Sequence, residues 1–320
     1  MRRLSIRNLG PVREADIELG RTNVIIGEAA GKSCVMKTAA FCARAEKEIR
    51  RAPSHRWFGE EGSFLRDLLA FYRMEGYGRE DTRIGYETDL VRFSYDNSTG
   101  EFAIEREEER QDSAFPHIAY IPTERNIVAA VPNWKDAGAG DDYVRGFMLG
   151  WERARCSCGK GADIPVLDVT YRYDKTSHGD LTGIGGGRET GMINASSGLQ
   201  SAVPLYVYVD YITGHGGGED PRPCRLFIEE PESGLFPPTQ CRLAQWLMEK
   251  AADGHRLFVS THSPYILSAF VEGKPEDFRL LFLKRGADGM TTVRTATPDD
   301  ISEINYYGTD PFINIGAYNK

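Results

Sequence analysis

Apolar residues in this chain follow two patterns, short continuous runs and longer runs that recur every three or four positions. Continuous runs stand at residues 24–26, 117–121, 226–228 and 256–260. They predict strands that are buried on both faces, as in a parallel sheet covered by helices. Runs with the helical interval stand at residues 35–49, 63–77, 240–251 and 264–271. They predict amphipathic helices, so the chain alternates strand and helix as α/β proteins do.

A third pattern, the alternation of apolar and polar residues, predicts half-exposed strands in the N-terminal part. It covers residues 4–19 and 83–106, and Asp96–Gly100 within the second stretch has the composition of a hairpin turn. Residues 280–283 and 291–294 predict a closing hairpin. We therefore expect antiparallel strands beside the buried ones.

The local pattern leaves the structure of residues 202–212 open between helix and strand. Ser196 and Ser197 precede this apolar stretch in the manner of a helix N-cap. In contrast, Tyr206–Tyr211 favours a strand by propensity, and Pro204 disfavours a helix.

Three segments without a clear period are expected to be irregular. Residues 156–164, rich in Cys, Gly and Lys, predict a linker, and residues 301–320 show no strong pattern. The glycine cluster Gly183–Gly187 has no Lys-Ser pair and no clean helix after it. We interpret it as a hairpin tip and not as a phosphate-binding loop.

Composition and charge narrow the functional classes. At 320 residues, with 41% hydrophobic and 27% charged content, the chain predicts one large domain or two modest ones. Its net charge of −8 disfavours nucleic-acid binding through bulk electrostatics, although a local basic groove stays open. No apolar run is long enough for a membrane span, and the six irregularly spaced cysteines indicate reduced thiols. We therefore expect a cytoplasmic protein without a membrane partner.

A glycine loop links the strand at 24–26 to the helix at 35–49. Its sequence runs Gly27-Glu-Ala-Ala-Gly-Lys32-Ser33. Glycines let backbone N–H groups face phosphate oxygens, and the helix N-terminus adds a positive dipole there. In a phosphate-binding loop Lys32 would reach the β- and γ-phosphates, and Ser33 would bind Mg²⁺. The spacing is one residue shorter than usual, which leaves weakened or lost nucleotide binding as an alternative.

Two carboxylates end the strand at 226–228, and a histidine follows the next buried strand. Glu229 and Glu230 come directly after the apolar run, and Pro231 stops the strand. In open α/β sheets, ligands bind at the carboxyl ends of strands. Because both strands would deliver their polar residues to one edge, Glu229, Glu230 and His262 predict a hydrolytic site. The alternative is an ordinary strand with exposed acids at its end.

These motifs stand in the order of an ABC-type ATPase. The chain resembles the branch of that family with the RecF, SMC and OLD (overcoming lysogenization defect) ATPases. Residues 27–33 match the Walker A loop with its shortened spacing, and 226–230 match Walker B with Glu229 where Asp is usual. Residues 196–200, Ser-Ser-Gly-Leu-Gln, resemble the ABC signature, and His262 matches the switch histidine. The phrase Glu-Glu-Pro-Glu is typical of the OLD-like proteins.

The resemblance implies ATP and Mg²⁺ as cofactors and suggests a role for each site residue. Lys32, Glu230 and His262 would be catalytic: Glu230 would deprotonate the attacking water, and His262 would sense the γ-phosphate. Ser33 and Glu229 would hold Mg²⁺. Besides Lys32 and Ser33, the nucleotide-binding residues would be Gly27, Glu28, Ala29, Ala30, Gly31, Cys34, Ser197, Gly198 and Gln200.

The resemblance also implies the fold and the assembly. The fold would be a P-loop NTPase of the ABC-ATPase type: a mixed central sheet with helices on both faces, an antiparallel β subdomain and a small helical signature subdomain. One domain would cover residues 1–320, with a P-loop and antiparallel part (1–125), a helical and signature part (126–212) and a Walker B and switch part (213–320). The signature of one subunit would complete the site of another, which implies a head-to-tail homodimer. Residues 198–212 would then be a helix.

Several features depart from the family pattern. Thr123 stands where the family has the glutamine of its Q-loop, so Glu124 or Arg125 becomes a candidate substitute. No aromatic residue precedes the glycine loop, so a preference for ATP over GTP rests on the resemblance alone. The chain has no long coiled-coil insertion, and too few residues follow position 271 for the Toprim nuclease domain of full OLD proteins.

Three functions stay open from the sequence. The first is a stand-alone ATPase whose dimerisation regulates a separate effector, a nuclease or toxin, as in bacterial anti-phage defence modules. The second is a RecF-like DNA-repair clamp, which the net charge of −8 disfavours. The third is a non-hydrolysing nucleotide-binding scaffold, which the short loop favours but Lys32, Glu230 and His262 disfavour.

Overall fold

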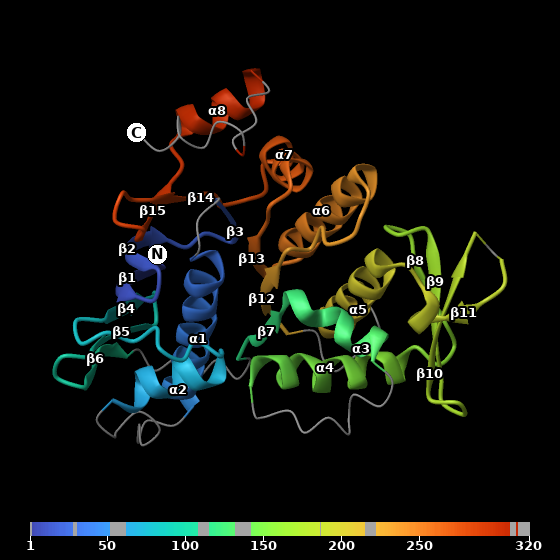
Figure 1. Cartoon of the computed structure of the whole chain (residues 1–320), viewed down its shortest axis with the longest axis horizontal. Coiled ribbons are helices and arrows are strands. Elements are labelled where there is room, and N and C mark those ends of the chain that lie inside the picture. Colours follow the sequence, from blue (N-terminus) through green and yellow to red (C-terminus); the bar gives the residue numbers. More distant parts are fainter. Residues whose placement is uncertain are drawn as a thin grey trace.

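A large mixed sheet runs through the molecule (Figure 1). The computed structural model describes residues 2–27, 31–51, 62–107, 115–131, 142–185, 187–214, 222–307 and 312. Within them the strand order is β6-β5-β4-β1-β2-β15-β14-β3-β13-β12-β7. The strands are β1 (Arg3–Leu9), β2 (Val12–Glu18), β3 (Thr22–Ile26), β4 (Arg83–Glu87), β5 (Val91–Asp96), β6 (Glu101–Glu107), β7 (His117–Ile121), β12 (Cys224–Glu229), β13 (Arg256–Ser260), β14 (Phe278–Arg285) and β15 (Thr291–Thr295).

Helices cover both faces of this sheet. α1 lies on one side of the β12–β13 region, and α6 with α7 lies on the other (Figure 1). The helices are α1 (Lys32–Arg51), α2 (Ser63–Phe71), α3 (Ile127–Ala130), α4 (Tyr143–Ser157), α5 (Ser197–Ile212), α6 (Pro237–Ala252), α7 (Pro264–Gly273) and α8 (Pro298–Tyr307), with short 3-10 helices η1 (Thr123–Asn126) and η3 (Met192–Asn194). Among the described residues, none of these helices combines the length and hydropathy needed to cross a membrane.

The sheet divides into an antiparallel and a parallel region. β1, β2, β4, β5 and β6 form antiparallel pairs. β3 pairs in parallel with β13 and β14, and β12 pairs in parallel with β13 and β7. Every residue of β3 and β12 is buried, as their continuous apolar runs predict. Because β3, β13 and β12 are parallel neighbours, their carboxyl ends at Ile26, Ser260 and Glu229 lie at one edge of the sheet.

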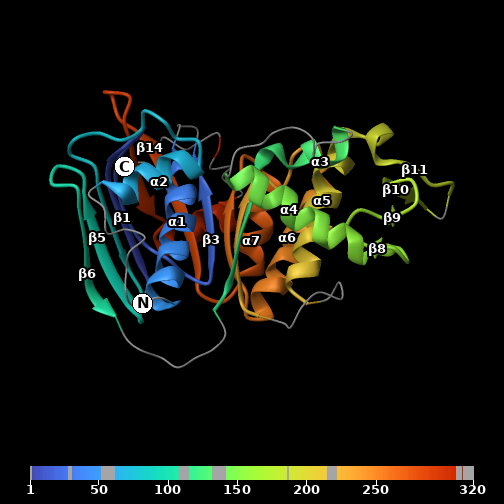
Figure 2. The same cartoon turned by 90° about the horizontal axis from the view of Figure 1, so that it is seen from below.

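Beyond the edge strand β7 lies a second part, built from α3, α4, α5 and a small antiparallel sheet (Figures 1 and 2). That sheet has the order β11-β10-β9-β8, with β8 (Ala162–Ile164), β9 (Val169–Asp174), β10 (Gly179–Ile184) and β11 (Thr190–Gly191). Trp151 of α4 packs on Tyr171 of β9, with ring centroids 5.6 Å apart. Tyr206 of α5 stacks on Trp246 of α6 at 4.4 Å. The first contact joins α4 to the small sheet, and the second joins α5 to α6, which covers the large sheet.

The fold class and most of the predicted elements are confirmed, and the closing hairpin is the antiparallel pair of β14 and β15. Residues 202–212 belong to α5, whose N-cap Ser196 accepts a hydrogen bond from the Leu199 N–H, so tertiary burial overrides local strand propensity. The linker predicted at 156–164 is wrong in part, because α4 ends at Ser157 and β8 begins at Ala162. The sequence pattern also missed α8, since its polar residues hide the helical period.

Candidate nucleotide-binding site

Lys32 is the first residue of α1 and follows the carboxyl end of β3 across the glycine loop. Its side chain is buried, and its Nζ donates a hydrogen bond to the Gly27 carbonyl. Burial lowers the pKa of Lys32, while the charges of Glu230 and Glu232 act in the opposite direction. Lys32 is therefore a desolvated cation at a helix N-terminus, where phosphate groups bind. Residues 28–30, which we predict to bind phosphate, lie outside the described residues.

The residues beside Lys32 divide between those that face the core and those that face outward. Gly27 has φ +151°, and a Cβ added there would lie 2.6 Å from the Leu283 Cβ, so no other residue fits. Ser33, the predicted Mg²⁺ ligand, is exposed. Cys34 is buried, its thiol donates to the Leu9 carbonyl at 3.6 Å, and burial raises the pKa of the thiol to about 12. Ser33 thus presents a side chain to a ligand, whereas Cys34 can offer only its backbone N–H.

Glu229 is the last residue of β12 and only 3% exposed. Its Oε1 has no hydrogen-bond partner among the described residues. Burial, and then the charge of Glu229, raise the pKa of the neighbouring Tyr120 hydroxyl well above its usual value. A buried carboxylate oxygen without a partner is unfavourable unless a cation or water meets it. This atom therefore fits a place in the shell of a Mg²⁺ ion, directly or through water.

Glu230 is held in a strained conformation just after β12. Its φ is +42°, in the left-handed region that residues other than glycine rarely adopt, at a cost on the order of 1–3 kcal/mol. Its N–H donates to the Ser260 carbonyl at 2.9 Å, so β13 fixes the peptide. The carboxylate is half-buried and lies 3.6 Å from Nε2 of His262. Strained residues concentrate at active sites, which supports Glu230 as the reacting carboxylate.

His262 follows β13 and faces Glu230. Burial, and then the positive charge of Lys32, lower the pKa of His262 below its usual 6.5, against the opposing effect of Glu230. The imidazole is therefore mostly neutral at pH 7 and can donate or accept a hydrogen bond. Its backbone N–H donates to Oε1 of Glu232 at 2.7 Å. Sequence reasoning assigned no role to Glu232. Burial raises the pKa of this carboxyl, which joins the loops after β12 and β13 to each other.

Arg125 is fully buried and contacts the backbone of Glu229 and Glu230. Its guanidinium donates to the carbonyls of Pro122 at 3.0 Å, Ser201 at 3.1 Å, and Glu229 and Glu230 at 2.7 Å each. Burial lowers the pKa of Arg125 to about 10, so the group stays charged at neutral pH. Of the two candidate substitutes for the family glutamine, Glu124 is exposed and Arg125 joins η1, α5 and the end of β12.

The residues that we predict to form the signature stand at the start of α5 and have different environments. Ser197 is exposed, whereas Gly198 is buried. A Cβ on Gly198 would lie 2.2 Å from the carbonyl oxygen of Gly234, in the loop after β12, so only glycine fits. Gln200 donates from its amide to two carbonyls of η3. That amide is therefore engaged within its own chain, although the sequence predicts it on the nucleotide.

The structure brings Lys32, Glu229, Glu230 and His262 to one edge of the sheet, at the ends of β3, β12 and β13. The start of α5 is joined to this group through the Gly198–Gly234 contact and through Arg125. Among the residues that the structure describes, no three His, Cys, Asp or Glu side chains gather as a metal site. Mg²⁺ commonly binds through one or two protein ligands together with substrate phosphates, and this donor set fits that mode.

Sequence comparison now identifies the family. A family model for AAA domains, whose description refers to the AbiEii toxin of a type IV toxin–antitoxin system, matches residues 101–268, just over half of the chain. The chain belongs to this AAA family. The match includes Arg125, Glu229, Glu230, His262 and residues 196–200. No curated protein matches the sequence.

Solved structures show the fold of this AAA-family chain. The head domain of an SMC protein with an extended coiled coil, bound to the C-terminal domain of ScpA from Pyrococcus furiosus, matches with a TM-score of 0.51 and 10% identity, covering 95% of this chain and 98% of that one. An SMC head bound to the C-terminal winged-helix domain of ScpA matches with a TM-score of 0.50 and 12% identity, covering 93% and 98%. The chain therefore has the fold of an SMC head ATPase domain.

Gly198→Ala is expected to impair the signature through a steric clash. The added methyl group would meet the Gly234 carbonyl, push the start of α5 away from the loop after β12 and destabilise the fold by about 1–3 kcal/mol. We expect ATP turnover to fall about a hundredfold, because displacements near 1 Å at a catalytic site have effects of that size. Gly146→Ala, in α4 with open space around its added Cβ, is the control. Equal turnover in the two variants would show that the Gly198 contact is not needed.

Proposed function

We propose that this protein binds ATP with Mg²⁺ and hydrolyses it in a head-to-tail homodimer that regulates a separate effector protein. One observation carries the proposal: Lys32, Glu229, Glu230 and His262 lie together at the carboxyl ends of adjacent parallel strands. Phosphoryl transfer depends mainly on positioning and on neutralising charge. This group supplies a cation, a metal-binding oxygen, a base and a neutral hydrogen-bonding imidazole.

Each residue has a part in hydrolysis that its environment supports. Lys32 would bind the β- and γ-phosphates, and bound Mg²⁺, held by Ser33 and Glu229, would neutralise their charge. Glu230 would orient the attacking water and accept its proton, because the Ser260 carbonyl and Arg125 fix its peptide. His262, mostly neutral at pH 7, would hydrogen-bond to the γ-phosphate and report whether it is present.

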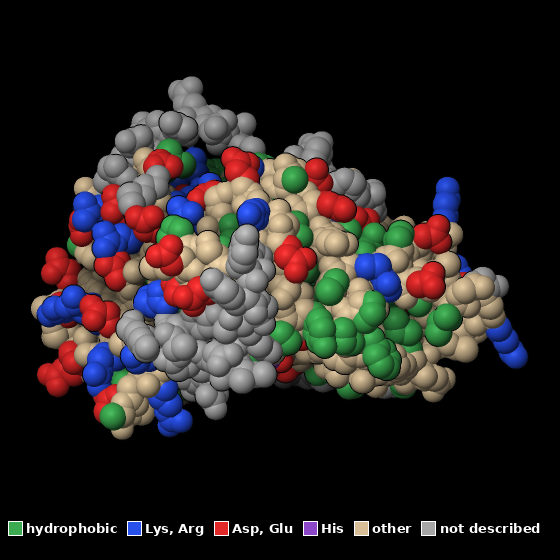
Figure 3. Space-filling view, turned by 90° about the horizontal axis from the view of Figure 1, so that it is seen from above, with side chains coloured by type: hydrophobic (Ala, Val, Ile, Leu, Met, Phe, Trp, Pro, Cys, Tyr) green, Lys and Arg blue, Asp and Glu red, His purple; other side chains and the backbone are tan. Residues whose placement is uncertain are grey.

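Exposed apolar residues beside the signature support association of two heads. Ile193 is 48% exposed and Phe236 is 81% exposed, and they flank the signature and the Gly234 loop, respectively. Figure 3 shows apolar side chains gathered over the half of the molecule that contains α5, α6 and the small sheet, whereas acidic and basic side chains alternate over the other half. Exposed apolar clusters of this kind mark protein interfaces. A second head that places its nucleotide against Ser197 would cover this region.

A separate effector is supported by the comparisons. In both matched SMC structures the head is bound to a domain of ScpA, so this fold can carry a partner protein. The family description refers to a toxin. We infer a defence-type system in which nucleotide-dependent closure of the head dimer changes the activity of a bound nuclease or toxin.

Lys32→Ala tests the nucleotide site. Removing the ammonium group is expected to lower ATP turnover by about a hundredfold and to abolish ATP-dependent dimerisation in sedimentation experiments. Lys175→Ala, an exposed lysine in the turn after β9, should behave as wild type. Turnover by Lys32→Ala at the wild-type rate would exclude this site, and no turnover by the wild-type dimer would favour the scaffold function instead.

Purifying the protein together with its bound partners in two nucleotide states tests whether the nucleotide regulates an effector. We expect tagged Glu230→Gln to stay ATP-bound and tagged Lys32→Ala to stay nucleotide-free. When purified from native cells, the two variants should retain the same partner in different amounts. Mass spectrometry of both samples measures the difference. A partner set that is identical in amount in both states would contradict nucleotide-dependent regulation.

A further inference from the structure

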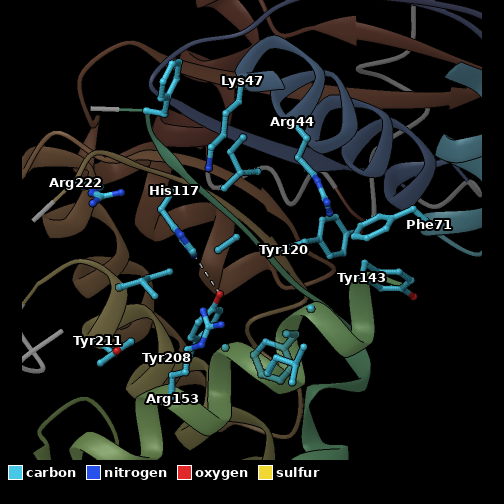
Figure 4. A pocket seen from close by; sticks show the side chains of 18 of the residues that line it. Arg44, Lys47, Phe71, His117, Tyr120, Tyr143, Arg153, Tyr208, Tyr211 and Arg222 are labelled. Atoms are coloured by element: carbon cyan, nitrogen blue, oxygen red, sulfur yellow. Dashed lines mark hydrogen bonds between the residues drawn. The ribbon is translucent and has the colours of Figure 1, made fainter. Parts of the chain in front are cut away.

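A second cavity lies between α1, α2, β7, α4 and α5 (Figure 4), and its inner wall includes Tyr120, the neighbour of Glu229. It encloses about 360 Å³, which is within the roughly 300–1,000 Å³ of small-molecule sites. Arg44 and Lys47 reach into it from α1, His117 lies on β7, and Tyr208 lies on α5 with its hydroxyl 3.4 Å from Nε2 of His117. The cavity therefore has walls from five packed elements, and none of its lining residues is among those that we predict to bind ATP.

One end of the cavity, at His117 and Arg222, lies at the end of the sheet opposite to Glu229 and Glu230, whereas its other end reaches Tyr120 beside Glu229. His117 is the first residue of β7, and Arg222 precedes β12, which begins at Cys224. Glu229 stands at the other end of β12, roughly 15–20 Å away at the rise of a β-strand. A phosphate group held at the His117 and Arg222 end would therefore not compete with ATP for the same residues.

Positive charge is concentrated in this cavity. Arg44, Lys47, Arg153 and Arg222 line it, and none of its described lining residues is acidic. This contrasts with the net charge of −8 for the whole chain. Burial, and then the charge of Arg51, lower the pKa of Lys47; the charge of Glu48 opposes this, and Arg44 and Arg222 lower the pKa further. Cations that repel one another across a concave wall favour a polyanionic ligand.

Flat aromatic faces adjoin these cations. Those lining the cavity include the rings of Phe71, Tyr120, Tyr143 and Tyr211. The guanidinium carbon of Arg44 lies 4.0 Å from the ring centroid of Phe71, which shows that a planar cation already stacks there. Aromatic rings and guanidinium planes are the surfaces on which nucleobases stack.

We propose that this cavity binds a nucleoside phosphate. Its phosphate would lie among Arg153, Arg222 and Lys47, and its base would lie against the aromatic wall. Inorganic phosphate would satisfy the cations but leave the aromatic wall without a partner. The same chemistry occurs in a free nucleotide and at the 5′-phosphorylated end of a single strand, and both would use the same residues.

Binding measured in the Lys32→Ala background tests the proposal without interference from the ATP site. Isothermal titration would use adenosine 5′-monophosphate, uridine 5′-monophosphate, ribose 5-phosphate and a 5′-phosphorylated decathymidylate. The double variant Arg153→Glu, Arg222→Glu removes two exposed cations that line the cavity. The matched control is Lys160→Glu with Lys175→Glu, an equal change of charge at exposed lysines outside the cavity. Circular dichroism would verify that both variants are folded.

We expect the lysine control variant to bind a nucleoside monophosphate. The variant Arg153→Glu, Arg222→Glu should bind it with an affinity at least tenfold lower than that of the control. Binding of the decathymidylate with much higher affinity than the monophosphates would identify a strand end as the ligand, and preference for a monophosphate would identify a free nucleotide. Equal affinity for ribose 5-phosphate and the nucleotides would refute recognition of the base. No binding by the control, or equal binding by both pairs, would refute the site. None of these outcomes depends on whether the protein hydrolyses ATP.

Discussion

Replacing Glu230 with glutamine is expected to abolish ATP hydrolysis while ATP binding persists, so that ATP-bound dimers accumulate. Glutamine has the same shape and can keep the left-handed backbone at φ +42°, but its amide cannot accept the proton of the attacking water. Loss of a general base typically lowers turnover by about 10²–10⁴. Lys32, Ser33 and Glu229 are unchanged in this variant and should still bind Mg²⁺ and ATP. Turnover assays and sedimentation with ATP would measure the two effects separately.

Glu272→Gln, an exposed carboxylate in α7, is the matched control for Glu230→Gln. It should hydrolyse ATP and dissociate after turnover as the wild type does. Unchanged turnover in Glu230→Gln would remove Glu230 from the catalytic role. Lost turnover together with lost ATP binding would show that the substitution disturbs the fold of the site, and the role of base would then lack support.

The part of the site that the sequence predicts is the part that lies on buried strands and at a helix start. The apolar runs before Gly27 and Glu229 specify strands, and parallel neighbours must end at one edge, so Lys32, Glu230 and His262 meet. The local pattern could not decide between helix and strand for residues 202–212, because burial of this segment against the rest of the protein favours the helix. Local propensity carries no information on that contact.

The sequence could not predict the residues that hold the site in place, for a different physical reason. Glu232 and Arg125 act through backbone groups, and any residue supplies a carbonyl or an N–H, so no side-chain pattern marks the acceptors. Arg125 was a candidate only because it stands beside the missing glutamine, and its four carbonyl partners come from three separate segments. The sequence does not predict the left-handed φ of Glu230 either, because glycine is the residue expected in that conformation. The basic residues of the second cavity are likewise distant in the chain.

Arg125→Lys is expected to destabilise the fold and to slow turnover even though the charge is kept. A lysine ammonium is a compact donor and cannot reach four carbonyls that a planar guanidinium spans. Each buried carbonyl left without a partner costs about 1–3 kcal/mol, so we expect a loss of roughly 3–5 kcal/mol in the free energy of unfolding in urea. Because two of these carbonyls belong to Glu229 and Glu230, the carboxylates lose their fixed positions. Affinity for ATP should change less than turnover, since Lys32 lies on another element.

Two further variants separate positioning from loss of stability. Arg83→Lys, at an exposed ion pair in β4, should change stability by less than about 0.5 kcal/mol. Ile17→Ala, fully buried in β2, should lose about 2–5 kcal/mol and still turn over ATP at the wild-type rate below its unfolding temperature. If Arg125→Lys, equally destabilised, keeps the same turnover as Ile17→Ala, then Arg125 serves the fold alone. If its turnover falls while Ile17→Ala stays active, the guanidinium holds Glu230 in the geometry that hydrolysis needs.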